Sequence, residues 1–176
     1  MAFDLQPTLE GRLVTLRPLS PVDHDRLFAV AADPLIWEQH PDKTRFHPVG
    51  FKAFFQQALD SGGALLALET ASGGVIGSSR FHGYDEAADE IEIGWTFLAR
   101  SHWGGQYNRE MKRLMLEHAF RYVGRVVFLI DPANHRSQRA IEKIGAVRVG
   151  MRADASGRSS CVFQISVREW RSRAEQ

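Results

Sequence analysis

Two adjacent glycines, Gly104 and Gly105, separate a strand-like segment from a helix-like segment, and such a junction can bind an anion. Residues 90–98 alternate between polar and apolar side chains, which predicts a strand. Apolar side chains then recur at helical spacing, which predicts a helix over residues 108–123. Small residues before a helix let backbone N–H groups point at an anion, and the helix dipole adds roughly 0.3–1 kcal/mol of attraction. The sequence therefore predicts a phosphate-binding loop between the two elements.

Two common phosphate-binding loops do not match the residues that follow. A nucleotide-hydrolysing P-loop ends in Gly-Lys-Ser/Thr, whose lysine and hydroxyl hold phosphate and magnesium, and no such triplet follows Gly105. A dinucleotide-binding fold needs three spaced glycines and an acidic residue about 20 positions further on. Only two adjacent glycines occur here, so neither motif explains the loop.

Several other segments, taken with this loop, resemble those of one family. They are residues 9–18 (Leu-Glu-Gly-Arg-Leu-Val-Thr-Leu-Arg-Pro), 92–95 (Glu-Ile-Gly-Trp), 103–104 (Trp-Gly), and 134–137 (Asn-His-Arg-Ser), which lead to 144–146 (Ile-Gly-Ala). Together they resemble the GNAT acyl-CoA N-acyltransferases, and within that family the branch that includes the ribosomal-protein N-terminal acetyltransferases. The resemblance spans most of the chain. It implies acetyl-CoA as co-substrate, no metal, and transfer of an acetyl group to a primary amine in a ternary complex.

The resemblance also implies a set of cofactor-binding residues around the glycine loop. The family's loop usually reads Arg/Gln-x-x-Gly-x-Gly/Ala, and Gln106 and Asn108 stand here where the family has small residues. An amide side chain at either position could donate a hydrogen bond to phosphate. The backbone of Phe97 and Leu98 is expected to bind the pantetheine amides. The pyrophosphate is expected at Arg100, Gly104, Gly105, Gln106, Tyr107, Asn108 and Arg109, with Tyr107 and Trp103 serving first in packing.

Attack on a thioester requires a neutral amine, and this calls for a proton acceptor nearby. A lysine-type amine lies about three pK units above neutral pH, a deficit of roughly 4 kcal/mol, whereas an α-amine costs about 1 kcal/mol. Ile91, Ile93 and Trp95 are expected to share one face of the predicted strand. Glu92 lies on the opposite, polar face and is the first candidate base, although it could instead pair with an arginine or face water. His82, at the end of the preceding strand, is the second candidate, with a solvated side chain as its alternative.

The leaving thiolate and the developing oxyanion need further groups. The resemblance implies that Asn134 binds near the pantetheine and that Ser137 approaches the sulfur, where it could donate a proton. Both side chains could instead cap the following helix, and capping is compatible with either role. The carbonyl oxygen becomes negative during attack, and an unpaired backbone N–H within residues 94–97 is the expected donor to it.

The acceptor side of the site is the least determined by the sequence. Trp37, His40 and Arg45 follow Pro34 and are candidate acceptor-pocket residues, whereas a tryptophan near a proline often anchors a loop. The resemblance favours either the N-terminal α-amine of a protein or peptide, or a small-molecule amine, without distinguishing them.

Two other classes of function stay open. Because Gln106 and Asn108 depart from the family loop, the chain could hold acyl-CoA as a regulatory protein without turnover. Alternatively, Phe51, Phe54 and Phe55 could form an exposed patch that binds other proteins, in a domain that does not bind CoA.

The composition limits the number of domains, the classes of partner and the cellular compartment that we expect. A chain of 176 residues is expected to form one domain over residues 1–176, long enough to bury roughly 70% of its unfolded surface. The formal net charge of +1, from 22 basic and 21 acidic residues, gives no positive field to recruit nucleic acid or a membrane. Cys161 is the single cysteine, and no apolar run reaches the roughly 20 residues of a membrane span or has the layout of a signal peptide. These features favour a cytoplasmic protein and leave a homodimer open.

The predicted elements form a single α/β (α+β) unit with a mixed, mostly antiparallel, twisted sheet. The resemblance implies a splay between two central parallel strands and helices on both faces. Strands are expected at residues 12–17, 64–69, 75–82, 90–98, 125–131, 147–151 and 161–170, and helices at residues 20–31, 51–59, 108–123 and 137–144. The three strands within residues 64–98 should form an antiparallel meander, residues 125–131 should run parallel to residues 90–98, and the last two strands should form a hairpin.

Overall fold

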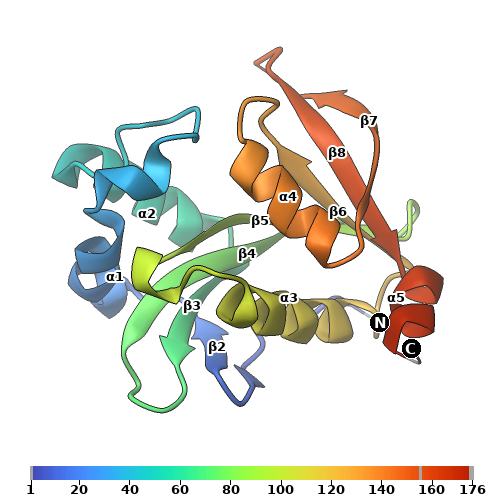
Figure 1. The fold of residues 1–176 in the computed structure, drawn as a ribbon, viewed down its shortest axis with the longest axis horizontal. Helices are drawn as coiled ribbons and strands as arrows, with labels where there is room; N and C mark the ends of the chain where they lie inside the picture. The colour runs from blue at the N-terminus through green and yellow to red at the C-terminus, as the bar shows by residue number, and fades with distance from the viewer. Residues whose placement is uncertain (1, 155, 175–176) are drawn as a thin grey trace.

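The computed structural model describes residues 2–154 and 156–174 and places eight strands in one sheet with helices on both faces (Figure 1). The strands follow the order β1-β2-β3-β4-β5-β6-β8-β7 across the sheet. The predicted fold class is therefore confirmed, including the antiparallel meander of β3 to β5 and the final hairpin. Residues 1, 155, 175 and 176 of the predicted domain lie outside the described residues.

Each predicted element is present, although several begin or end at different residues. The strands are β1 (Leu9–Glu10), β2 (Val14–Pro18), β3 (Ala64–Glu69), β4 (Val75–Asp85), β5 (Glu90–Leu98), β6 (Arg125–Ile130), β7 (Val147–Ala153) and β8 (Ser159–Ser166). The α-helices are α1 (His24–Ala31), α2 (Pro48–Asp60), α3 (Gln106–Ala119), α4 (His135–Lys143) and α5 (Val167–Ala174), and the 3-10 turns are η1 (Pro21–Asp23), η2 (Pro34–Trp37) and η3 (Arg100–His102).

Strands β5 and β6 run parallel, as predicted, but they pair over a short stretch. Residues 90–92 lie in register with residues 125–127, and the pairing ends there. On its other side, β5 stays paired with β4 as far as Leu98. The two parallel strands therefore separate after Glu92, and the sheet opens at the end where β5 leads into the glycine loop.

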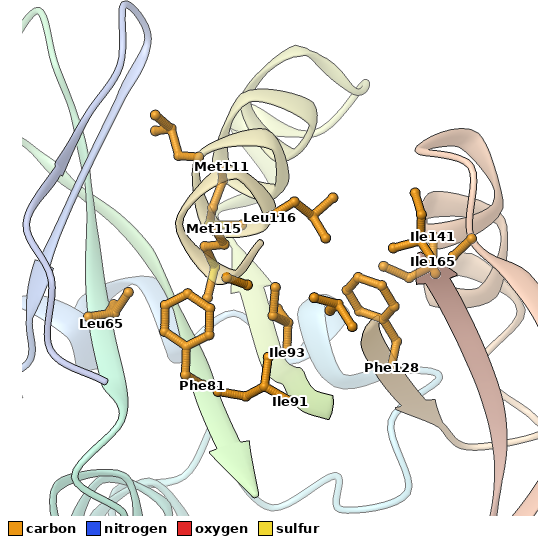
Figure 2. Packing of buried hydrophobic residues seen from close by; sticks show 14 of the residues in the cluster. Leu65, Phe81, Ile91, Ile93, Met111, Met115, Leu116, Phe128, Ile141 and Ile165 are labelled. Atoms are coloured by element: carbon orange, nitrogen blue, oxygen red, sulfur yellow. The ribbon is translucent and has the colours of Figure 1, made fainter. Parts of the chain in front are cut away.

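Apolar side chains form a separate cluster on each face of the sheet. On one face, α3 places Met115 against the cluster that contains Phe81 (Figure 2). On the other face, α1 and α2 bury Phe51, Phe54 and Phe55, which are 0%, 4% and 5% exposed. The hypothesis that these three phenylalanines form an exposed patch for other proteins is wrong, because they make up the second core.

A β-bulge in β5 reverses the direction of Trp95. The pairing of β4 with β5 shifts between Ser78 and Arg80, and Trp95 has a φ of 52°. Ile91 and Ile93 lie in the cluster beneath α3, whereas Trp95 packs on the cluster beneath α1 and α2. The prediction that Trp95 shares a face with the two isoleucines is therefore wrong, because the extra residue of the bulge breaks the alternation.

Helix α3 begins and ends earlier than predicted. It starts at Gln106 because Gly105, with a φ of 108°, is the last residue before the helical turn. It ends at Ala119, although Tyr122 continues the apolar spacing and still packs against the core. The helix predicted from Ser20 likewise opens as a 3-10 turn before α1 begins at His24.

Residues 161–170 were predicted to form one strand, and this prediction is wrong. β8 ends at Ser166, and α5 follows directly. The Ser166 N–H donates to the Glu169 carboxylate at 2.8 Å, and the Glu169 N–H donates to the Ser166 hydroxyl at 3.3 Å. This reciprocal pair is a capping box, a Ser-x-x-Glu signal for a helix start that outweighs the apolar residues of the strand.

A lysine lies inside the core beneath the bulge. Lys112 of α3 is 2% exposed, and its ammonium group donates to the hydroxyls of Thr96 and Ser79 and lies 5.9 Å from the Phe128 ring centroid. Burial lowers the pKa of Lys112 to about 7. Because an unfolded lysine has a pKa of about 10.4, the unfolded chain binds more protons than the folded chain between these two pKa values, and stability rises with pH across that window.

Replacing Lys112 with methionine should therefore stabilise the protein most at low pH. We expect a gain of about 1–4 kcal/mol in the free energy of unfolding at pH 6, since a buried charge is exchanged for an apolar chain of similar length. Ser79 and Thr96 keep their mutual hydrogen bond of 2.8 Å. The gain should shrink as the pH approaches 10, because the folded lysine is then neutral and deprotonating the unfolded lysine, with its pKa of about 10.4, costs little.

Denaturant unfolding of both proteins at pH 6 and pH 9.5 measures this difference. Lys52→Met, at an exposed position on α2, is the matched control and should show no pH-dependent difference. A Lys112→Met effect of equal size at both pH values would contradict the depressed pKa.

Candidate active site

The glycine loop before α3 has an open backbone. Gly104 and Gly105 have φ values of 106° and 108°, and a Cβ at either position would meet no atom within 4 Å. Gln106 is exposed at the first position of the helix, so its side chain does not fill the loop. The first N–H groups of α3 have no helical partner, and an anion can approach them closely.

A hollow of about 400 Å³ beside the start of α3 carries positive charge. It is lined by Arg12, Leu13, Gln106, Arg109, Glu110 and Arg113. The carboxylate of Glu110 is already engaged, because it accepts the backbone N–H groups of residues 12–14 at 2.6–3.2 Å. Arg113 pairs with Glu117 at 2.7 Å. Arg12 and Arg109 have no ion pair among the described residues, so their guanidinium groups are the ones that can meet phosphate groups here.

Other predicted cofactor residues have partners inside the protein. The Arg100 guanidinium pairs with Asp33. The Tyr107 hydroxyl donates to Glu69 at 2.9 Å, which fits its expected packing role. Phe97 is buried at the end of β5, as is its neighbour in sequence, so these two positions offer backbone rather than side-chain contacts.

Glu92 and His82 are register partners on β5 and β4, so their side chains lie on the same face of the sheet. A Cβ placed on Gly94 would lie 3.1 Å from Glu92 Oε1, so the glycine leaves room for the carboxylate. Burial raises the pKa of Glu92 to about 7, against the opposing charges of Arg152 and Arg80. A carboxyl group with this pKa can exchange a proton near neutral pH.

His82 is more exposed than Glu92 and is a weaker base. Its ring lies 5.1 Å from that of Trp95. Burial and the charge of Arg80 lower its pKa below 6.5. The two candidate bases are thus adjacent, with pKa values displaced in opposite directions.

The bulge lies where β6 leaves β5. The backbone strain of a non-glycine residue at positive φ, here Trp95, costs on the order of 1–3 kcal/mol and persists where surrounding contacts enforce it. In the described part of the chain no register pair joins residues 94–97 to β6. Their backbone groups on that side are therefore available to a ligand entering the splay.

Helix α4 lies on the far side of the splay and begins at the predicted Asn134 motif. The Asn134 side chain accepts the Ser137 N–H at 3.1 Å, so it caps the helix, the structural role that the sequence left open. The Ser137 hydroxyl is half-buried and forms no hydrogen bond with any described residue. It remains free to donate to a group in the splay.

The three candidate acceptor residues have different surroundings. Trp37 is 3% exposed, and its indole N–H donates to the Ala31 carbonyl at 2.8 Å, so it anchors the loop. His40 accepts the Asp42 N–H through Nδ1 at 3.0 Å, and burial lowers its pKa to about 4. Arg45 lies 4.4 Å over the Phe54 ring, beside the face that carries Glu92.

Arg136 ties this loop to α4. Its backbone N–H donates to Gln39 at 3.0 Å, its guanidinium donates to the Ile36 carbonyl at 2.7 Å, and it lies 4.3 Å over the Trp103 ring. These contacts occupy Arg136, which therefore acts as a brace between segments that flank the splay.

Two buried cations near the site were not predicted from sequence patterns. Lys112 follows Met111 on α3 and lies outside the apolar positions that recur at helical spacing. It is buried because the buried face of the helix is wider than those positions indicate. Arg80 precedes His82 by two residues and therefore shares its face of β4. The same period of two that placed His82 on this face could have identified Arg80.

Within residues 2–154 and 156–174, no three His, Cys, Asp or Glu side chains gather into a metal site. None of the helices described is both long and apolar enough to cross a membrane.

Comparison with known proteins agrees with this geometry. A curated relative, the uncharacterized protein YkkB from Bacillus subtilis (strain 168), is 47% identical over 57 residues, which make up 31% of this chain and 33% of the relative. A GCN5-related N-acetyltransferase from Brucella melitensis has a similar fold, with a TM-score of 0.84 and 22% identity over 97% of this chain and 83% of that chain. RimJ from Mycobacterium smegmatis, solved in complex with CoA-disulfide, has a TM-score of 0.70 and 17% identity over 93% of this chain and 87% of its own.

The family assignment comes from the match to a sequence model. Residues 13–147 match the acetyltransferase (GNAT) domain, a span that runs from the N-terminal strands through α4 to the start of β7. The matched span contains the glycine loop, the bulge and the splay. The chain therefore belongs to the GNAT acetyltransferase family.

Proposed function

We propose that this protein is an N-acetyltransferase that uses acetyl-CoA to acetylate a primary amine by direct attack in a ternary complex. The observation that carries the proposal is the position of Glu92, a half-buried carboxyl group with a pKa of about 7 beside Gly94 at the mouth of the splay. The glycine loop, the arginine-lined hollow and the splay fit the phosphates and the extended pantetheine arm of the cofactor.

Glu92 is the general base that removes a proton from the acceptor amine. In its ionised form it accepts a proton from the ammonium group, directly or through water, and leaves a neutral amine. A carbon–nitrogen bond then forms as the carbon–sulfur bond breaks, and the second amine proton is released. An α-amine is deprotonated at a cost of about 1 kcal/mol at neutral pH, against roughly 4 kcal/mol for a lysine-type amine, so a base of this strength suits the former better.

Groups on both sides of the splay stabilise the charges that develop on the carbonyl oxygen and on the leaving sulfur. A backbone N–H within residues 94–97 donates to the carbonyl oxygen, because β6 has left that side of β5. The Asn134 side chain accepts the Ser137 backbone N–H and fixes the start of α4, and the Ser137 hydroxyl donates to the leaving sulfur. Acceptors consistent with this chemistry are the N-terminal α-amine of a peptide or protein and small-molecule amines.

Glu92→Gln should lower kcat by about 10²-fold or more, because general-base catalysis contributes about 10²–10⁴ in rate. In the unmodified protein, kcat/KM should rise with pH through an apparent pKa near 7, where Glu92 loses its proton. The variant should lose this limb of the profile. Free-thiol release measured from pH 5.5 to 9 tests both effects.

His82→Gln is the matched comparison, because His82 faces Glu92 in register. It should retain the limb near pH 7. A profile whose limb lies below pH 6.5 and disappears in His82→Gln would transfer the role of base to His82, whose pKa is lowered.

Gly104→Val should weaken acetyl-CoA binding by about tenfold or more. A side chain at a φ of 106° forces the loop to rearrange and crowds the approach to the first N–H groups of α3. Isothermal titration calorimetry measures the affinity directly, and it also identifies a protein that binds CoA without turnover.

Gly62→Ala controls for backbone strain, since Gly62 has a φ of 66° and open space but ends α2, away from the loop. It should lower stability without changing the affinity for acetyl-CoA. Unchanged affinity in Gly104→Val would place the phosphates elsewhere.

A further inference from the structure

Arg80 is a buried cation without an anion. It lies in the middle of β4 and is 5% exposed. Its Nε and Nη2 atoms are enclosed and have no hydrogen-bond partner. Among the described residues, its guanidinium also forms no ion pair.

The contacts that Arg80 does make are too weak to offset this burial. Its guanidinium lies 4.4 Å over the Trp95 ring, and this cation–π contact supplies no hydrogen bond. Burying an ion whose N–H groups are unpaired costs more free energy than such a contact returns. The nearby positive charge of Arg45 adds to the cost, and together with burial it lowers the pKa of Arg80 to about 10. An anion bound to the guanidinium would offset the cost of burying this charge.

The neighbouring carboxylates do not fill this role. Glu92 is close enough to favour the charged form of Arg80, but no ion pair within 4.0 Å joins them in the described structure. A carboxylate that neutralised Arg80 would have a lowered pKa, whereas the pKa of Glu92 is raised to about 7. Asp42 is paired with Arg45 at 3.3 Å. These carboxylates therefore leave Arg80 available.

Arg80 lies on the proposed acceptor side of the site. It is the register partner of Gly94, two residues from His82 on the same strand face, and Trp95 covers it. Arg45 approaches from the loop that follows η2, and both guanidinium groups lie over the Phe54 ring, at 5.9 Å and 4.4 Å. The guanidinium groups of Arg80 and Arg45 therefore both pack against the cluster on the sheet face that carries Glu92.

We infer that the acceptor is an amine that carries an oxyanion, a carboxylate or a phosphate, which pairs with Arg80 while its amine faces Glu92. This inference rests on the proposed function and names the substrate class for it. Guanidinium forks bind both kinds of oxyanion through paired hydrogen bonds. Neutral amines leave Arg80 buried and unpaired in the complex, and that penalty provides the discrimination.

Matched acceptors test the inference. One pair is phosphoethanolamine and ethanolamine, and the other is an α-amino acid and its amide, so that each pair differs in the anionic group. We expect kcat/KM for the anionic member of at least one pair to exceed that of its neutral partner by tenfold or more. The pair that shows the preference identifies the oxyanion as phosphate or carboxylate.

Variants at Arg80 test whether that residue binds the anionic group of the acceptor. Arg80→Met should reduce the preference to less than threefold by lowering kcat/KM for the anionic acceptor much more than for the neutral one, and Arg80→Lys should be intermediate because it keeps the charge but loses the fork. Arg121→Met, at an exposed position after α3, is the control and should keep the full preference. Acetyl-CoA affinity should be unchanged in all three variants. Arg80→Met should melt no lower than the unmodified protein, because it removes an unpaired buried charge.

The outcomes separate this inference from the proposed function. Equal use of both members of each pair, or an equal loss for both in Arg80→Met, would overturn the inference while leaving an active acetyltransferase. If none of the four amines releases thiol, none of them is an acceptor, and thermal stabilisation by the same four amines becomes the measurement. Stabilisation by the anionic member that Arg80→Met abolishes then supports an anion site, and its absence overturns it.

Discussion

Backbone pairing at the centre of the sheet stops after Glu92, and the rest of the site depends on that loss. A strand inside a sheet normally pairs on both sides, and unpaired buried N–H groups cost free energy. Here β5 continues along β4 while β6 turns away, and the bulge at Trp95 lies just beyond the point of separation. The backbone groups of β5 on that side are therefore left open to water or to an extended ligand.

The bulge also sorts the buried ionisable groups onto two faces. Thr96 turns toward α3 and accepts from Lys112, whereas Trp95 turns to the opposite face and covers Arg80. On the α3 face the ammonium is satisfied by hydroxyl groups of the protein, so Lys112 belongs to the scaffold. On the opposite face the guanidinium has no partner and a carboxyl group has a raised pKa. Unsatisfied groups therefore gather on the sheet face that carries Glu92, and such clustering is typical of a functional site.

The sequence predicts the regular elements well because their signals are local. Periods of two and 3.6 residues locate the central strands and α3, and the glycine pair locates the loop between them. The sequence predicts the bulge badly, because nothing in Gly94-Trp95-Thr96 shows that one residue leaves the alternation. That single event misplaces Trp95, whereas the regular register before it keeps Arg80 on the same face as Glu92. The error over residues 161–170 has another cause. The Ser-x-x-Glu capping box at Ser166 is visible in the sequence, but the apolar strand before it suggested that the strand continues. Glu92 and His82 are register neighbours, while their roles, like that of Ser137, stay predictions.

In the proposed mechanism, the arrangement of Arg80 and Glu92 makes the pKa of Glu92 depend on substrate binding. A cation near a carboxylate favours its ionised form and makes it a weaker base. Arg80 acts on Glu92 in this direction, and burial acts in the other and is larger. An oxyanion on Arg80 would cancel part of the guanidinium's field, so the pKa of Glu92 would rise further as the acceptor is seated. Charge recognition and proton transfer are then linked through one pair of residues on adjacent strands. An amine without the anion would meet both a poorer fit and a weaker base.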